Sequence, residues 1–204
     1  MAITTYAELQ TAVKNWLDRT STEITSRAPE FIALAEAKLN RDLRVRPMEV
    51  VGSDTMSSGA ISLPADWLAY KSIWYTYSGS RVELINMAPQ EFNRFDTGTT
   101  DYPSGYYIAA SSVYFGPSTP NSDYTVGYIY YQKIPALTDS NTTNWLLTSH
   151  PDIYLYGSLL EAAPYLKEYP EIQLWMTAFG AVIEQLKQSD RDVMSGAPLR
   201  MRAY

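Results

Sequence analysis

The chain has 204 residues, of which 46% are hydrophobic and 19% charged, and its formal net charge is −6. This length and balance predict a folded protein of one domain or two small ones. An acidic chain lacks the excess of Lys and Arg that neutralises phosphates, which argues against a protein that binds nucleic acid through its phosphates. The absence of cysteine excludes disulfides and thiolate metal sites.

The first 47 residues show helical periodicity. Thr5 and Glu8 have the spacing of a capping box, in which the hydroxyl and the carboxylate satisfy free backbone N–H groups at the start of a helix. Apolar residues then recur every three or four positions as far as Leu17. A second helix is predicted to begin near Pro29 and to end before Pro47.

The middle of the chain is rich in Tyr, Ser, Thr and Gly, which favours short strands. Alternating patterns predict strands over 70–77, 106–109, 113–115 and 124–131, with a hairpin turn at 78–80. A short helix is expected over 89–95, and segments 97–103 and 117–123 have the composition of exposed turns.

Helical spacing returns towards the C-terminus. The sequence at 149–152 is typical of a helix start, and the helix after it is apolar on two faces, which predicts burial on both sides. The last helix has an apolar stripe over 172–186. Beyond it, residues 191–204 include Gly196 and Pro198 and lose the helical period.

These elements predict an α+β fold. Segments 1–47 and 144–190 are expected to form a helical bundle, and residues 48–143 an inserted antiparallel β domain. Residues 191–204 are expected to form a C-terminal extension.

No group of residues points to catalysis. The single histidine, His150, lies between Ser149 and Asp152, and a catalytic triad of these residues stays open because its geometry is spatial. We favour capping of the helix start by Ser149 and Asp152. With one His, no Cys and no EF-hand or phosphate-loop spacing, we expect no catalytic residue, no cofactor and no metal.

Two features suit contacts with other molecules. Arg41, Arg44 and Arg46, with Lys38, form a basic cluster at the end of the second helix, where cations complement the helix C-terminus. A partner site at Arg41, Arg44 and Arg46 is the alternative interpretation.

The second feature is the content of five Trp and 17 Tyr. Tyr suits the half-buried face of a sheet, so most of these residues are expected in the β core. Tyr and Trp are also enriched at protein interfaces, so some are expected to meet neighbouring chains. An aromatic-rich module that binds glycans is the alternative function, and a hydrolase with a pair of carboxylates is a second rival.

Both ends of the chain resemble the head–tail adaptor proteins of tailed bacteriophages, the group similar to the tail tubular protein of T7-like phages. The N-terminal motifs are TTYAEL at 4–9, WLDR at 16–19 and PEFIALAE at 29–36. The C-terminal motifs are NWLL at 144–147, HPD at 150–152, YLYG at 154–157, LEAAPYL at 160–166 and SGAPLRMR at 195–202.

This resemblance implies a structural protein and not an enzyme. It implies a helical bundle with an inserted β domain, assembled as a dodecameric ring under the portal at the head–tail junction of the virion. The expected partners are the portal protein, other copies of the chain, and a downstream tail or nozzle protein. Genomic DNA is expected to pass through the channel without specific binding. We expect no membrane association, and synthesis in the host cytoplasm.

The C-terminal extension is the predicted portal-binding segment, and a frayed, solvated terminus is the alternative interpretation. Leu199 and Met201 alternate with Arg200 and Arg202, and Arg191 adds a further positive charge. An extended segment with this pattern presents apolar side chains to one surface and charges to another. The resemblance points the same way, since it implies that the C-terminus reaches into the portal ring.

Overall fold

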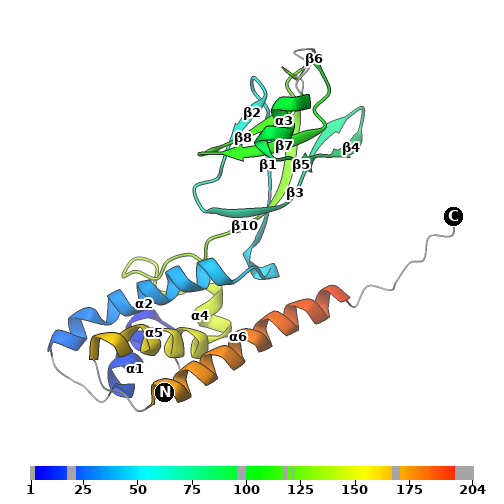
Figure 1. Cartoon of the computed structure of the whole chain (residues 1–204). Coiled ribbons are helices and arrows are strands. Elements are labelled where there is room, and N and C mark those ends of the chain that lie inside the picture. The colour runs from blue at the N-terminus through cyan, green and yellow to red at the C-terminus, as the bar shows by residue number, and fades with distance from the viewer. Residues whose placement is uncertain are drawn as a thin grey trace. The chain divides into compact units, whose positions relative to one another are not determined.

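The computed structural model describes residues 3–17, 22–95, 100–116, 119–120, 122–166 and 171–195. The chain divides into two compact units, shown in Figure 1. We call residues 1–47 with 134–204 the helical unit and residues 48–133 the β unit. Helices and sheets together confirm the α+β prediction, with six α-helices in the described ranges.

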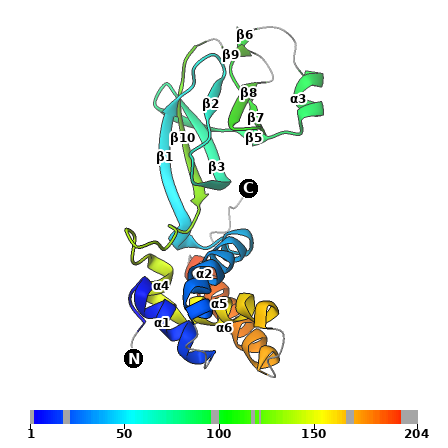
Figure 2. The same cartoon turned by 90° about the vertical axis from the view of Figure 1, so that its left-hand side faces the viewer.

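The helical unit contains five of these helices. They are α1 (Tyr6–Trp16), α2 (Thr22–Asp42), α4 (Trp145–Ser149), α5 (Pro151–Leu166) and α6 (Ile172–Ser195). Helix α5 packs against α1, α2, α4 and α6, and Figure 2 shows it between α2 and α6. It is buried on more than one side, as its two apolar faces predicted.

Helix α1 begins with the predicted capping box. The Glu8 carboxylate accepts the Thr5 N–H at 3.0 Å, and the Glu8 N–H donates to the Thr5 hydroxyl at 3.3 Å. Thr4 also donates its hydroxyl to Glu8 at 2.7 Å, and these hydrogen bonds lower the pKa of Glu8 to about 2. The start of α1 is therefore held by bonds that the sequence pattern alone anticipates.

Two helix boundaries differ from the prediction. Helix α2 begins at Thr22, so Pro29 lies inside the helix and not at its start. Burial of Ala28, Phe31 and Ile32 on one face outweighs the backbone hydrogen bond that proline cannot make. Helix α4 was not predicted, and the Asn144 side chain caps it by accepting the Leu147 N–H at 2.9 Å.

The β unit is built on two sheets. The first has the order β1 (Glu49–Thr55), β10 (Thr125–Gln132), β3 (Trp67–Tyr77) and β4 (Ser80–Glu83), all antiparallel. The second has the order β2 (Ala60–Ser62), β8 (Ser112–Gly116), β7 (Gly105–Ala109) and β5 (Ile85–Asn86), with β5 parallel to β7. A 3₁₀ turn (Arg46–Met48), helix α3 (Pro89–Phe95) and the short pair β6 (Thr100–Asp101) and β9 (Thr119–Pro120) complete the described elements.

The core of the β unit is aromatic. Tyr124, Val126, Tyr128 and Tyr130 are all buried, which confirms the alternation predicted for residues 124–131. They form one cluster with Met56, which follows β1, and with apolar side chains of both sheets, including Ile61, Ile73, Tyr75, Val113 and Phe115. Most of the tyrosines in this cluster are thus structural, as expected for a pleated sheet.

Residues 134–143 return the chain to the helices and are held against α2. The buried Glu36 carboxylate accepts the Leu137 N–H at 2.9 Å and the Tyr154 hydroxyl at 3.0 Å. Asn40 accepts the Ile134 N–H at 2.8 Å, and Asn144 donates to the Tyr154 oxygen at 2.7 Å. The sequence placed 134–143 with the β domain, whereas these bonds hold it to the helical unit. The limits of independently folding domains stay a prediction.

Burial raises the pKa of Glu36, and the two hydrogen bonds that it accepts oppose this effect. The folded protein therefore binds a proton at Glu36 more tightly than the unfolded chain does. This contribution to stability is present below the usual pKa of 4.5 and is lost as pH rises through the raised value.

We predict that Glu36→Gln gains stability relative to the wild type as pH rises above 4.5, because the amide oxygen accepts the same bonds without a buried charge. Urea unfolding between pH 4 and pH 8 measures the difference in unfolding free energy. The matched control is Glu30→Gln, since the Glu30 side chain is 60% exposed on the same helix. A difference between Glu36→Gln and wild type that is constant with pH contradicts the prediction.

Candidate assembly surfaces

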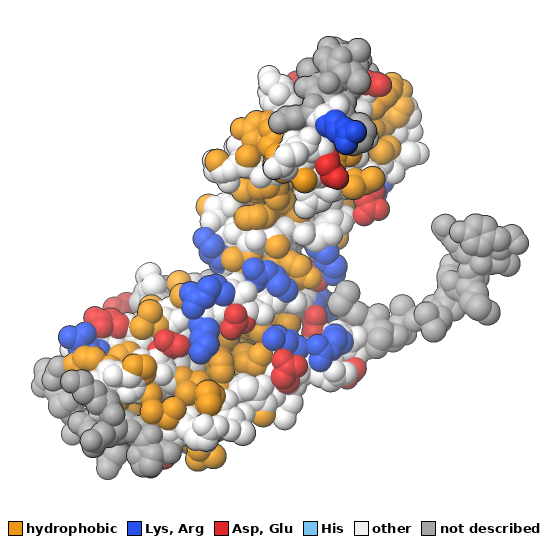
Figure 3. All heavy atoms as spheres, in the orientation of Figure 1, with side chains coloured by type: hydrophobic (Ala, Val, Ile, Leu, Met, Phe, Trp, Pro, Cys, Tyr) orange, Lys and Arg blue, Asp and Glu red, His pale blue; other side chains and the backbone are white. Residues whose placement is uncertain are grey.

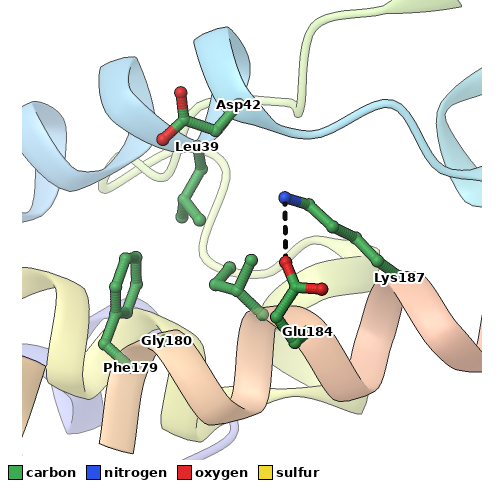
Figure 4. A pocket seen from close by; sticks show the side chains of 7 residues that line it. Leu39, Asp42, Phe179, Gly180, Glu184 and Lys187 are labelled. Atoms are coloured by element: carbon green, nitrogen blue, oxygen red, sulfur yellow. Dashed lines mark hydrogen bonds and ion pairs between the residues drawn. The ribbon is translucent and has the colours of Figure 1, made fainter. Parts of the chain in front are cut away.

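A groove of about 310 Å³ lies between α2 and α6 in the helical unit (Figure 4). Its apolar lining residues are Leu39 from α2 and Phe179 and Ile183 from α6. Figure 4 shows Leu39 and Phe179 on opposite sides of the groove. Both helices pack against α5. A Cβ atom added at Gly180 would meet no atom within 4 Å, so the groove is open at this position.

The rim of this groove is charged. Asp42 lines it from α2, while Glu184 and Lys187 line it from α6 and form an ion pair with an N–O distance of 3.4 Å. The Lys38 ammonium lies 5.5 Å from the centre of the Phe179 ring, within the range of a cation–π contact. An apolar lining flanked by charged residues is typical of a protein contact surface.

A second hollow brings two predicted interaction sites together. Arg44, from the basic cluster, and Arg191, from the predicted portal-binding segment, both line it, together with Asp42, Val45, Lys187 and Asp190. The backbone N–H of Arg46 donates to the Asp190 carboxylate at 2.9 Å, which joins the 3₁₀ turn after α2 to α6. The sequence predicted the basic cluster and the C-terminal segment as separate sites, because Arg44 and Arg191 are more than 140 residues apart in the chain.

The bonds of Arg44 agree with a structural function. Its guanidinium donates to the carbonyl oxygens of Asn40, at 2.8 Å, and of Leu43, where α2 ends. Arg191 donates to Gln188 at 2.8 Å and lies 4.0 Å from Glu184. Arg41 and Arg46 are exposed. A partner site at Arg41, Arg44 and Arg46 stays a prediction.

The predicted portal-binding residues fall into two groups. Arg191 lies on α6, which continues to Ser195 and so extends beyond the apolar stripe on which the sequence prediction relied. Leu199, Arg200, Met201 and Arg202 lie outside the described residues.

Large apolar side chains are exposed on both units. On the helical unit they include Trp16, Leu34, Leu174, Met176 and Val193, and on the β unit Val51, Tyr77, Ile85, Tyr102 and Tyr114. Figure 3 shows hydrophobic atoms on the visible surface of both units. Single exposed apolar residues are ordinary, but several on two separate units suit contacts with more than one neighbour.

The outer face of the first sheet has a hollow around Trp74. Ser72, Arg81, Glu83 and Ile129 line it with Trp74, and the Arg81 guanidinium lies 4.7 Å from the centre of the indole ring. A glycan bound to the β unit would be expected to stack on an exposed indole face. The Arg81 guanidinium already lies over the indole of Trp74, where a sugar ring would have to stack. The glycan-binding alternative stays a prediction.

The segment around His150 is a junction of two helices. His150 ends α4, its N–H donates to Leu146 at 2.7 Å, and its carbonyl accepts the Ile153 N–H at 3.2 Å. Asp152 accepts the same N–H at 3.0 Å, in the first turn of α5. Ser149 is the last residue of α4, so its predicted function as a cap of α5 is wrong.

Two further patterns bear on the described residues, those of a metal site and of a membrane-spanning helix. Across these ranges, no group of three or more His, Cys, Asp or Glu is placed to hold a metal ion. No helix among them is long and apolar enough to cross a membrane.

A family model described as SU10 adaptor protein matches residues 4–202, nearly the whole chain. This chain belongs to the SU10 adaptor protein family. No curated protein matches it. The SU10 adaptor family consists of structural bacteriophage proteins, so this adaptor is a component of the virion that contacts other phage head or tail proteins. The expectation of a phage adaptor is confirmed, and the specific similarity to T7-like tail tubular proteins stays a prediction.

We predict that His150→Ala lowers the unfolding free energy by about 1 kcal/mol or less and leaves virion assembly intact. The contacts that hold this junction come from the backbone of His150 and survive the substitution. Urea unfolding and complementation of a phage that lacks the adaptor are the measurements. A folded His150→Ala protein that fails to complement would show that the imidazole has a function.

Proposed function

We propose that this adaptor is a subunit of a ring that joins the portal to the tail at the head–tail junction. The observation that carries the proposal is membership of a phage adaptor family across residues 4–202. A part that joins two others needs separate contact surfaces. The exposed apolar residues of the helical unit and those of the β unit supply candidates.

A ring also requires contacts between its own copies. Head-to-tail contacts around a ring are heterologous, so each copy presents two different surfaces that complement each other. The proposed copy number is twelve, as the resemblance to head–tail adaptors implies. We further propose that the helical unit is a bundle that folds independently of the inserted β domain.

The proposed ring encloses a channel through which the genome passes. The net charge of −6 on each copy gives the assembled ring a strongly negative potential. Such a potential repels DNA phosphates, so the genome passes without binding to the wall. The proposed channel wall does not bind DNA in a sequence-specific way.

The portal contact is proposed at the C-terminal end of α6. The segment 196–204 continues from Ser195, and its Leu199 and Met201 are flanked by Arg200 and Arg202. The hollow that holds Arg44 and Arg191 lies near this end of α6. Together they present positive charge on a protein that is acidic overall.

We predict that the purified adaptor is mainly monomeric at micromolar concentration and forms rings of twelve copies on the portal protein of the same genome. A template places neighbouring copies side by side and so raises their effective concentration. Negative-stain microscopy of the mixture shows the rings, and light scattering of the adaptor alone gives its mass. Absence of any complex with the portal contradicts the proposed function. A stable dodecamer of the isolated adaptor at nanomolar concentration contradicts the need for a template.

We predict that truncation after Ser195 abolishes portal binding and leaves the melting temperature within a few degrees of wild type. The truncation keeps α6 whole and keeps the bond between Asp190 and Arg46. A full-length control with Leu199 and Met201 changed to Ser separates loss of the apolar contacts from loss of chain length. Unchanged portal affinity of the truncated adaptor would move the anchor to Arg41, Arg44 and Arg46.

A further inference from the structure

Strand β1 forms one edge of the first sheet, because in the described ranges it pairs with β10 alone. In an antiparallel ladder, hydrogen-bonded pairs recur at every second residue. The Met56 N–H donates to the Tyr124 carbonyl at 2.8 Å, in the register that β1 keeps with β10. The ladder therefore uses the backbone groups of Asp54, Gly52 and Val50.

The alternate residues of β1 turn their backbone groups towards the open edge. Thr55 shows this parity, since its N–H donates to the Asp54 carboxylate at 2.7 Å and not to β10. Val51 and Ser53 follow the same parity and are both exposed. The Val51 side chain is 72% exposed, more than any other large apolar residue on the described surface.

Strand β4 forms the opposite edge of the same sheet. The Leu84 N–H donates to the Ile73 carbonyl at 2.9 Å, in the register of the β3–β4 pair. By the same alternation Val82 pairs with β3, and the backbone groups of Arg81 and Glu83 face the open edge. The open part ends there, because β5 begins two residues later and pairs with β7.

The two edges match each other. Successive strands in the order β1, β10, β3, β4 are antiparallel, so β1 and β4 run in opposite directions. A copy placed beside another, edge to edge and facing the same way, brings its β4 antiparallel to the neighbour's β1. The residues whose backbone groups face the open edge are Glu49, Val51, Ser53 and Thr55 on β1, of which the Thr55 N–H is already used by Asp54, and Arg81 and Glu83 on β4.

The composition of the edges favours such pairing. Native edge strands are commonly protected by Lys, Pro or a bulge, and β1 carries neither Lys nor Pro. The charged residues of β1 are Glu49, which already pairs with Lys71, and Asp54, whereas β4 carries one cation, Arg81, and one anion, Glu83. Opposite charges on facing strands stabilise a pair, and in this arrangement only Arg81 and Asp54 can supply such a contact.

We propose that β1 of one adaptor pairs with β4 of the next copy, so that one antiparallel sheet continues across each subunit boundary. The contact is heterologous and repeats in one direction, as a closed ring requires. The closing of these contacts into a ring rests on the proposed function, whereas the pairing of two copies does not.

The test uses Val51→Pro, which removes an N–H from the open edge without removing a bond to β10. Sedimentation velocity between micromolar and millimolar concentration measures self-association, and mass photometry counts copies on each portal. We expect wild type to self-associate in the upper part of this range and Val51→Pro to weaken it at least tenfold. The matched control, Val51→Thr, keeps the N–H and the branched side chain and is expected to behave as wild type.

A mixing experiment identifies the partner strand. Glu83→Pro blocks the β4 edge alone, so neither Val51→Pro nor Glu83→Pro forms chains by itself. Mixed together, the two variants retain one intact β1 and one intact β4 edge, and they are expected to stop at dimers. Ser53→Pro is the second variant for the β1 edge if Val51→Pro does not fold.

Three results separate the possible failures. The proposal is overturned if folded Val51→Pro or Ser53→Pro self-associates as strongly as wild type. It is also overturned if wild type neither self-associates nor places copies side by side on the portal. Loss with Val51→Pro but not with Glu83→Pro overturns the assignment of β4 as the partner. Self-association that depends on both edges, with no binding to the portal, supports the pairing and contradicts the proposed function.

Discussion

The carboxylate of Glu36 joins parts of the helical unit that are more than 100 residues apart in the chain. The chain leaves this unit after Pro47 and returns at Ile134, so the N-terminal and C-terminal helices meet only if the returning segment is fixed. Glu36 fixes it by accepting bonds from Leu137 and Tyr154. A buried carboxylate without such donors would be strongly destabilising, so these bonds and the packing of α2 on α5 depend on each other.

This arrangement explains how one chain can carry an inserted sheet without losing its helical core. The β unit has its own cluster of buried aromatic side chains and its own hydrogen-bond ladders. Its two open edges can therefore be used for contacts between copies while the buried face of the sheet stays intact. The helical unit offers different surfaces, namely the groove between α2 and α6 and the second hollow, which Arg44 and Arg191 line. An adaptor of the SU10 family needs this separation of surfaces, because it contacts other head or tail proteins.

The sequence predicted the features that depend on local patterns. The capping box of α1 and the buried alternation of residues 124–131 are examples, since each follows from spacing within a few residues. The start of α2 was missed because tertiary burial tolerates Pro29 inside the helix. The function of Glu36 and the meeting of Arg44 with Arg191 were missed because long-range contacts leave no local pattern. The open edges at Val51 and Arg81 required the strand order, which sequence periodicity does not determine.

Backbone hydrogen exchange tests most directly whether the adaptor assembles through the edges of its β unit. Exchange is compared at single-residue resolution between the free adaptor and the adaptor assembled on its portal. Formation of a continuous sheet predicts that the amides of Val51, Ser53, Arg81 and Glu83 become protected on assembly. The amides of Ile73 and Val126, in the two central strands, are expected to be protected in both states. Assembly that leaves exchange at the β1 and β4 edges unchanged would contradict this account.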